Sequence, residues 1–183
     1  VLLLSYPTGL KAQGLAIAKL NQSSGVEEAS ACGVEIAKAI ECKDILILCG
    51  EFKKSANLVE GLILRNYNYL DQKTNTKNTA FNLQVMVQSV EEHVDKINEK
   101  LAVIDGVFFT RDLVNAPANV LTTSSFAEQL SALSDLGIKV EVLDEPELMK
   151  LGMRTLLCVG QGSDSPSKVC LLYTSPSPRD IGP

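Results

Sequence analysis

The chain has 183 residues, of which 45% are hydrophobic and 21% charged, and its formal net charge is −5. This composition is ordinary for a globular protein, and it excludes a collagenous chain, a disulfide scaffold and an intrinsically disordered chain. No run approaches the roughly 18 consecutive apolar residues of a membrane span, so we expect no membrane partner. The mild acidity disfavours a nucleic-acid binder, which usually carries a basic patch.

The residue inventory limits the chemistry that the chain can perform. The sequence contains one histidine, His93, and no tryptophan. Its five cysteines are odd in number, and no pair has the C-x-x-C spacing of a zinc site or a redox motif. The cysteines are Cys32, Cys42, Cys49, Cys158 and Cys170. Reduced, partly buried thiols in a cytoplasmic protein are the simplest interpretation.

In chain order, the first strong patterns predict a helix, a strand and a second helix. Residues 26–40 carry apolar side chains at helical spacing, with Ser23 or Ser24 as a cap. Residues 45–50 form a continuous apolar run closed by glycine, which predicts a strand buried on both faces. Residues 55–70 predict a second amphipathic helix.

The middle of the chain predicts a loop, a strand and a long helix. Residues 71–80 are polar without periodicity, which indicates an exposed loop. Apolar residues alternate over 81–87, as in a strand, and helical spacing returns over 91–114. The proline in residues 115–119, NAPAN, ends that helix because proline disfavours a helical residue before it.

The last third predicts two more helices and two more strands. Residues 122–125 offer caps for a helix over residues 126–136, with a capping box of Ser125 and Glu128, and Gly137 ends it. Residues 138–143 alternate as a strand. A short helix follows over 145–151, and the apolar run at residues 156–159 suggests another strand. The alternation predicts an α/β fold with a mostly parallel or mixed sheet.

Three clusters are candidate functional sites, and each has a sufficient structural explanation. The segment Gly160-Gln161-Gly162-Ser163 lacks the third glycine of a dinucleotide motif and the G-K-[ST] of a P-loop, which favours an ordinary loop. His93 follows two glutamates on a helix and is expected to be exposed. Asp144, Glu145 and Glu147 suit the N-terminus of a helix. We therefore predict no catalytic, cofactor-binding or metal-binding residue.

The tail differs from the rest of the chain. Residues 170–180, CLLYTSPSPRD, match one reading frame of a common transposon-type sequencing adapter over eleven residues. We expect residues 170–183 to be an adapter-derived tail and native sequence to end near Val169. Since no initiator methionine is present, we also expect the chain to begin inside its reading frame. A flexible Ser/Pro terminus is the alternative.

The most distinctive stretch is TRDLVNAPANVLT, residues 110–122. It closely resembles the segment that links the two domains of the cytosolic leucyl aminopeptidase (cytosol aminopeptidase) family. Two later blocks agree in order: VEVLDE at residues 140–145, and VGQGS at 159–163 with Pro166. An earlier block, EGLIL at residues 60–64, resembles a helix of the same family. The resemblance is strong over residues 108–167 and weaker over 46–69.

This resemblance implies two α/β domains. Residues 1–104 would form a macro-domain-like N-terminal domain with a mixed sheet. Residues 105–169 would form a linker helix and the truncated start of the aminopeptidase catalytic domain. The complete protein would release N-terminal residues from peptides with two divalent metal ions, zinc or manganese, as a cytoplasmic homo-hexamer. The family's metal-binding motifs do not occur in this sequence, so the resemblance transfers no metal ligand or catalytic residue and implies an inactive fragment. The alternatives are a macro-like ligand-binding module and a purely structural or oligomerisation domain.

Overall fold

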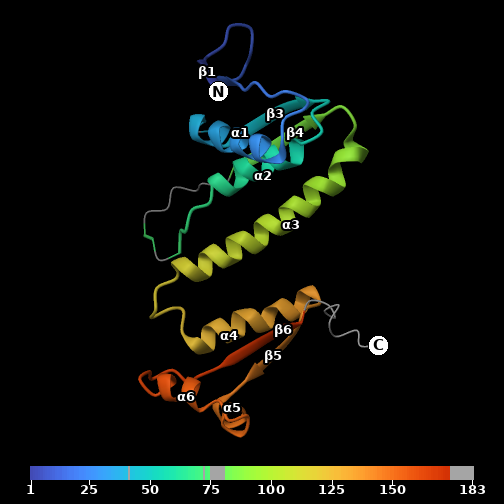
Figure 1. The fold of residues 1–183 in the computed structure, drawn as a ribbon. Helices are drawn as coiled ribbons and strands as arrows, with labels where there is room; N and C mark the ends of the chain where they lie inside the picture. The colour runs from blue at the N-terminus through green and yellow to red at the C-terminus, as the bar shows by residue number, and fades with distance from the viewer. Residues whose placement is uncertain (41, 72, 75–80, 174–183) are drawn as a thin grey trace, which may run out of the picture. The chain divides into compact units, whose positions relative to one another are not determined.

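The computed structural model describes residues 1–40, 42–71, 73–74 and 81–173. Helices and strands alternate along the chain, which confirms the predicted α/β class (Figure 1). The contacts divide the chain into two compact units, Val1–Val114 and Asn115–Pro183. The expected domain boundary between residues 104 and 105 lies inside a continuous helix, and the assignment of domains stays a prediction.

The described part of the first unit contains a hairpin, a pair of parallel strands and three helices. Their bounds are β1 Leu2–Ser5, β2 Gly14–Ile17, α1 Val26–Ala39, β3 Asp44–Gly50, α2 Ser55–Arg65, β4 Asn82–Val87 and α3 Val90–Asn115. Strand β1 pairs with β2 antiparallel, whereas β3 pairs with β4 parallel. The connection from β3 to β4 passes through α2, as parallel strands require a crossover. Most of the loop predicted over residues 71–80 lies outside the described residues.

Helices α1 and α2 form the core of the first unit, and two glycines allow their close approach. A Cβ added to Gly33 of α1 would lie 2.0 Å from the carbonyl oxygen of Leu58. A Cβ added to Gly61 of α2 would lie 2.0 Å from the carbonyl oxygen of Ser30. The adjacent buried side chains are Ile36, Ala37, Leu58 and Leu62. Backbone contact at these glycines therefore brings both apolar stripes into one core.

Strand β3 departs from the prediction of burial on both faces. Ile45, Ile47 and Cys49 are half-buried, and Ile47 packs against the α1/α2 core. Leu46 and Leu48 on the opposite face are 56% and 69% exposed. The prediction was wrong because, within the described residues, helices cover one face of this strand only. An apolar run shows that a strand is hydrophobic, but it does not show whether helices cover one face of the strand or both.

The predicted helices of this unit are confirmed, with corrections at their ends. The cap of α1 is Gly25, whose N–H donates to Glu28 Oε2 at 3.2 Å, and not Ser23 or Ser24. Helix α2 ends at Arg65 and not near residue 70. It ends there because the Asn66 side-chain amide donates to the Leu62 carbonyl oxygen at 3.1 Å, which satisfies a terminal carbonyl locally.

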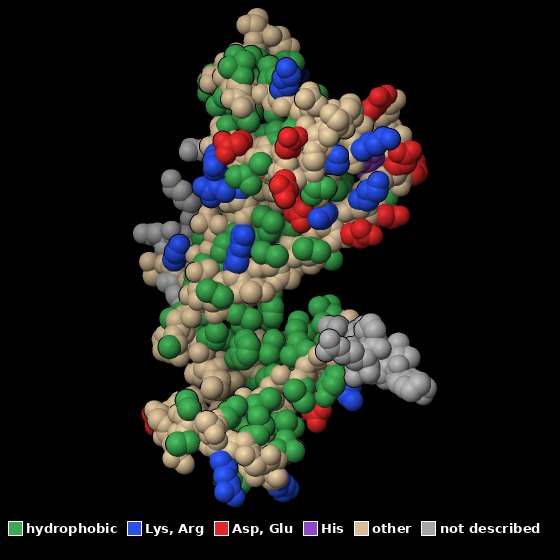
Figure 2. All heavy atoms as spheres, viewed as in Figure 1, with side chains coloured by type: hydrophobic (Ala, Val, Ile, Leu, Met, Phe, Trp, Pro, Cys, Tyr) green, Lys and Arg blue, Asp and Glu red, His purple; other side chains and the backbone are tan. Residues whose placement is uncertain are grey.

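Helix α3 is the long predicted helix, and its surroundings differ along its length. Ile104 is buried at 2% exposure, whereas Val94 and Leu101 of the same predicted stripe are 42% and 38% exposed. Figure 2 shows acidic and basic side chains gathered over the first part of the helix, where the sequence places Glu91 and Glu92. The apolar residues of α3 therefore recur at helical spacing, but this unit buries only some of them.

The described part of the second unit combines an antiparallel strand pair with short helices. Their bounds are α4 Thr123–Ser131, a 3₁₀ turn Ala132–Leu136, β5 Lys139–Leu143, α5 Glu145–Lys150, α6 Arg154–Gly160 and β6 Val169–Tyr173. Leu143 lies opposite Val169, and Lys139 lies opposite Tyr173. Gly137 ends the 3₁₀ turn with φ of 85°, as the sequence predicts.

Two sequence predictions for this unit were wrong. Helix α4 begins at Thr123 because Thr122 and Ser125 cap each other: the Thr122 hydroxyl accepts from Ser125 N–H, and the Ser125 hydroxyl accepts from Thr122 N–H. Thr122 lies within the predicted cap range, whereas the predicted box of Ser125 and Glu128 lies one turn too far along. The apolar run at residues 156–159 lies in helix α6 and is not a strand. Leu157 is buried whereas Val159 is 79% exposed. The apolar run therefore belongs to a short helix that buries one side only.

Strand β6 includes Cys170–Tyr173, the first residues of the segment expected to be adapter-derived. A pairing strand does not reveal the origin of its codons, so that expectation stays a prediction. Residues 174–183 of this segment lie outside the described residues. Among the helices of the described residues, none combines the length and the apolar character that crossing a membrane needs.

Candidate functional site

The distinctive stretch at residues 110–122 places Arg111 and Asp112 near the end of α3, where both contact the segment around the end of α2. The Arg111 guanidinium donates to the Leu64 carbonyl oxygen at 2.7 Å. Leu64 is in the last turn of α2, where helix carbonyls lack internal partners and carry partial negative charge. Arg111 therefore serves as a cationic cap of α2 supplied by another helix.

Tyr67 joins the same cluster from the chain that leaves α2. Its hydroxyl donates to Asp112 Oδ1 at 2.7 Å. Its ring centroid lies 5.1 Å from that of Phe108 in a tilted arrangement, and Arg111 Cζ lies 5.3 Å from the Tyr67 ring centroid. These distances suit an aromatic pair and a cation–π contact. Tyr67, Phe108, Arg111 and Asp112 with the Leu64 carbonyl are called the α2–α3 anchor below.

A second connection between the helices lies outside the anchor. Lys100 of α3 and Glu60 of α2 form an ion pair with a 3.0 Å separation between Nζ and Oε2. The Glu60 side chain is only 14% exposed, so water screens this pair less than a surface pair. Two polar connections therefore fix the orientation of α3 on α2.

The anchor is suited to positioning and not to bond-breaking. It contains no thiol or imidazole, and each polar side chain already contacts a partner within the first unit. Immediately after α3 the chain turns at Pro117, whose carbonyl oxygen accepts from the N–H groups of Val120 and Leu121, both at 2.9 Å. Residues 110–122 therefore contain both the last contacts of the first unit and the proline turn that begins the second unit.

His93 lies elsewhere in the first unit, and its predicted exposure was wrong. The side chain is 6% exposed in the first turn of α3. Its Nδ1 lies 2.8 Å from the Ser89 carbonyl oxygen, which accepts a hydrogen bond from the ring N–H. The residue therefore has a local structural role at the start of the helix.

The acidic cluster at the start of α5 also has structural partners. Asp144 Oδ1 accepts from Lys168 Nζ at 2.6 Å, and that hydrogen bond raises the pKa of Lys168. Glu145 Oε1 accepts from Ser167 N–H, and Glu147 Oε2 accepts from Asp144 N–H. The three carboxylates face different partners and do not converge on one point of the second unit.

The five cysteines are free. Burial raises the pKa values of Cys32 and Cys49, which lowers their thiolate fractions near neutral pH. The segment Gly160–Ser163, predicted as a loop after a strand, instead follows helix α6 as a turn in which Ser163 N–H donates to the Gly160 carbonyl oxygen at 3.0 Å. Neither feature assembles a nucleophile with a base.

Sequence comparison adds the observation that decides the family. The model of a protein family described as "Cytosol aminopeptidase family, catalytic domain" matches residues 108–181. A "Probable cytosol aminopeptidase" of Cereibacter sphaeroides is 37% identical over 180 residues, which cover 98% of this chain and 37% of that relative. The chain belongs to the cytosol aminopeptidase family. It spans little more than a third of the length of this relative.

Solved structures agree with the α/β fold of this chain. A structure titled "Bottromycin maturation enzyme BotP in complex with Mn" has a TM-score of 0.69 at 23% identity and covers 84% of this chain and 34% of that chain. A mutant of tomato leucine aminopeptidase has a TM-score of 0.70 at 21% identity, over 85% of this chain and 34% of that one. The similarity at these identities concerns the fold.

The family implies divalent metal ions, and the described residues do not fit them. Within residues 1–40, 42–71, 73–74 and 81–173, no three His, Cys, Asp or Glu side chains converge as a metal site would need. The sequence singled out the anchor's Arg111 and Asp112 by their motif, but it gave no signal for their contacts with Tyr67 and Leu64, because those partners are more than 40 residues away.

Proposed function

We propose that this chain is a scaffold and linker segment of a metal-dependent aminopeptidase that releases N-terminal residues from peptides. The α2–α3 anchor supports this proposal most directly. The residues that carry the family resemblance at 110–112 contribute Arg111 and Asp112 to it. The anchor orients the end of α3, where the family's catalytic-domain match begins at residue 108.

In this proposal, catalysis belongs to a longer protein that contains this segment. That protein would use two divalent ions, zinc or manganese, to activate water and to polarise the peptide carbonyl. The described residues hold neither ion, so no chemical step is assigned to them. The 183-residue chain alone is proposed to be inactive.

The test compares the 183-residue chain with the longer reading frame recovered from the same locus. Both are incubated with Mn²⁺ or Zn²⁺ and a chromogenic leucine anilide, and release of the aniline is followed. We expect turnover from the longer protein and none above the buffer blank from the short chain. Turnover by the short chain would show that its own residues catalyse the reaction, whereas an inactive but folded long protein would contradict the aminopeptidase assignment.

The partners and cellular location complete the proposal. The longer protein is proposed to bind peptides, to assemble as a cytoplasmic homo-hexamer and to bind neither membranes nor nucleic acid. Light scattering coupled to gel filtration of that protein measures its assembly. A mass equal to one subunit at micromolar concentration would contradict the hexamer.

A further inference from the structure

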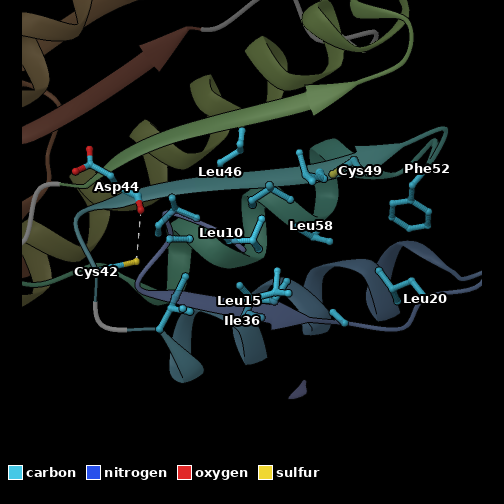
Figure 3. Close-up of a pocket in the computed structure, with 18 of the residues that line it drawn as sticks. Leu10, Leu15, Leu20, Ile36, Cys42, Asp44, Leu46, Cys49, Phe52 and Leu58 are labelled. Carbon is cyan, nitrogen blue, oxygen red and sulfur yellow. Dashed lines mark hydrogen bonds between the residues drawn. The ribbon is translucent and has the colours of Figure 1, made fainter. Parts of the chain in front are cut away.

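An open hollow of about 660 Å³ lies in the first unit, between the N-terminal segment and β3 (Figure 3). Leu10 and Leu15 line it from the N-terminal segment, Ile36 from α1, and Leu46 and Cys49 from β3. The lining is mainly apolar, which makes exposure of the hollow to water unfavourable.

The hollow runs along the edge of β3. All six residues from Asp44 to Cys49 line it. Successive strand residues place their side chains on opposite faces, so a cavity on one face would contact only every second residue. Contact with all six means that the hollow faces the edge of the strand, where backbone groups are available.

The hydrogen-bond pattern identifies which backbone groups of β3 face the hollow. Asn82 N–H of β4 donates to the Lys43 carbonyl oxygen at 2.6 Å, so residue 43 directs its backbone toward β4. In a parallel pair the direction of the backbone N–H and C=O groups alternates from residue to residue. The backbone groups of Ile45 and Ile47 therefore also point toward β4. Leu46 and Leu48 direct their N–H and C=O groups to the other edge. Among the described residues, no strand pairs with that edge.

The opposite wall of the hollow presents backbone groups of β2 in the same way. Tyr6 N–H donates to the Gln13 carbonyl oxygen at 2.9 Å, which makes this a hydrogen-bonded pair of the hairpin. Antiparallel pairs alternate, so Leu3 and Ala16, three positions along the ladder, form a non-hydrogen-bonded pair. Ala16 therefore directs its N–H and C=O away from β1. Ala16 also lines the hollow.

We propose that the N-terminal hairpin is a strap that closes onto β3. In the closed state β2 pairs with β3 in parallel, which makes one sheet in the order β1-β2-β3-β4. The order is compatible with the chain, because α1 connects β2 to β3 as α2 connects β3 to β4, and parallel neighbours need such crossovers. Closure satisfies the edge groups of Leu46, Leu48 and Ala16 and removes the apolar lining from water.

Amide hydrogen exchange measured by NMR on the 183-residue chain tests the strap. The informative variant is Ala16→Pro, which removes the N–H that closure needs but no hydrogen bond to β1, since that N–H points away from β1. The matched control is Ala12→Pro, which places proline just before β2. The amides of Ile45 and Ile47, bonded to β4, report in each variant whether the parallel pair remains folded.

We expect the Leu46 and Leu48 amides to exchange at least tenfold faster in Ala16→Pro than in the parent chain or in Ala12→Pro. The Ile45 and Ile47 amides should exchange at the same rate in all three. Leu46 and Leu48 amides that exchange in the parent chain as fast as in an unstructured peptide would overturn the proposal. Equal exchange at Leu46 and Leu48 in the two proline variants would overturn it as well.

Discussion

Gly33 and Gly61 show how much of this fold depends on the absence of a side chain. Each faces a backbone atom of the other helix, and an added Cβ at either position would lie 2.0 Å from a carbonyl oxygen. Helical spacing in the sequence placed Gly33 on the buried stripe of α1. It did not indicate that helix backbones meet there, because that requires knowledge of the partner surface.

Alanine at either glycine should separate the helices. We expect Gly33→Ala and Gly61→Ala each to lower the free energy of unfolding by about 1–3 kcal/mol, the usual cost of overpacking a core. The matched control is Gly106→Ala on α3, where an added Cβ meets no atom within 4 Å. That control should raise stability by up to about 1 kcal/mol, because alanine favours helix over glycine. Urea unfolding followed by circular dichroism measures both effects, and equal stability of Gly33→Ala and Gly106→Ala would contradict this account.

Among the secondary-structure elements, periodicity predicted the long helices and the alternating strand β4, whose apolar positions repeat over several turns or residues. Capping was less predictable, because Ser23, Ser24 and Ser125 all have suitable side chains and the choice depends on which backbone groups lack partners. The run at residues 156–159 is too short to distinguish a strand from a buried helix turn. The anchor could not be predicted beyond its motif, since Tyr67 comes from a separate element.

A substitution at Tyr67 tests how much the α2–α3 anchor stabilises the chain. Replacement of Tyr67 by phenylalanine keeps the ring contact with Phe108 but removes the hydroxyl that donates to Asp112. We expect a loss of about 1 kcal/mol in the free energy of unfolding, as for a typical intramolecular hydrogen bond. Tyr6→Phe is the control, since Tyr6 is 79% exposed. Chemical denaturation of both variants provides the comparison, and a Tyr67→Phe protein as stable as Tyr6→Phe would show that the bond contributes nothing.

At the scale of the whole molecule, the notable surface feature is one face of the β3–β4 pair, where apolar side chains remain accessible to water. Leu46, Leu48 and Met86 are 56%, 69% and 58% exposed. Composition indicates only an ordinary globular protein, because a hydrophobic content of 45% does not reveal which residues the described fold leaves uncovered. A contiguous apolar face promotes self-association, since water is released when two such faces meet.

A charge on that face should therefore reduce self-association. We expect Leu48→Glu to lower the concentration-dependent light scattering of the purified chain. Leu136→Glu is the control, because Leu136 is 77% exposed in the second unit and lies outside the β3–β4 face. If both variants scatter like the parent chain, association arises from a different surface.

The contact between α1 and α2 also restricts how this protein can change during evolution. Most core clashes can be relieved by shortening the opposing side chain. The atoms that a Cβ at Gly33 would meet first are the Leu58 carbonyl oxygen and the Leu62 amide nitrogen, and no substitution removes a backbone atom. A second-site suppressor of Gly33→Ala would therefore have to move a helix. In a suppressor screen, we expect reversion to glycine to be far more frequent than compensation at neighbouring side chains.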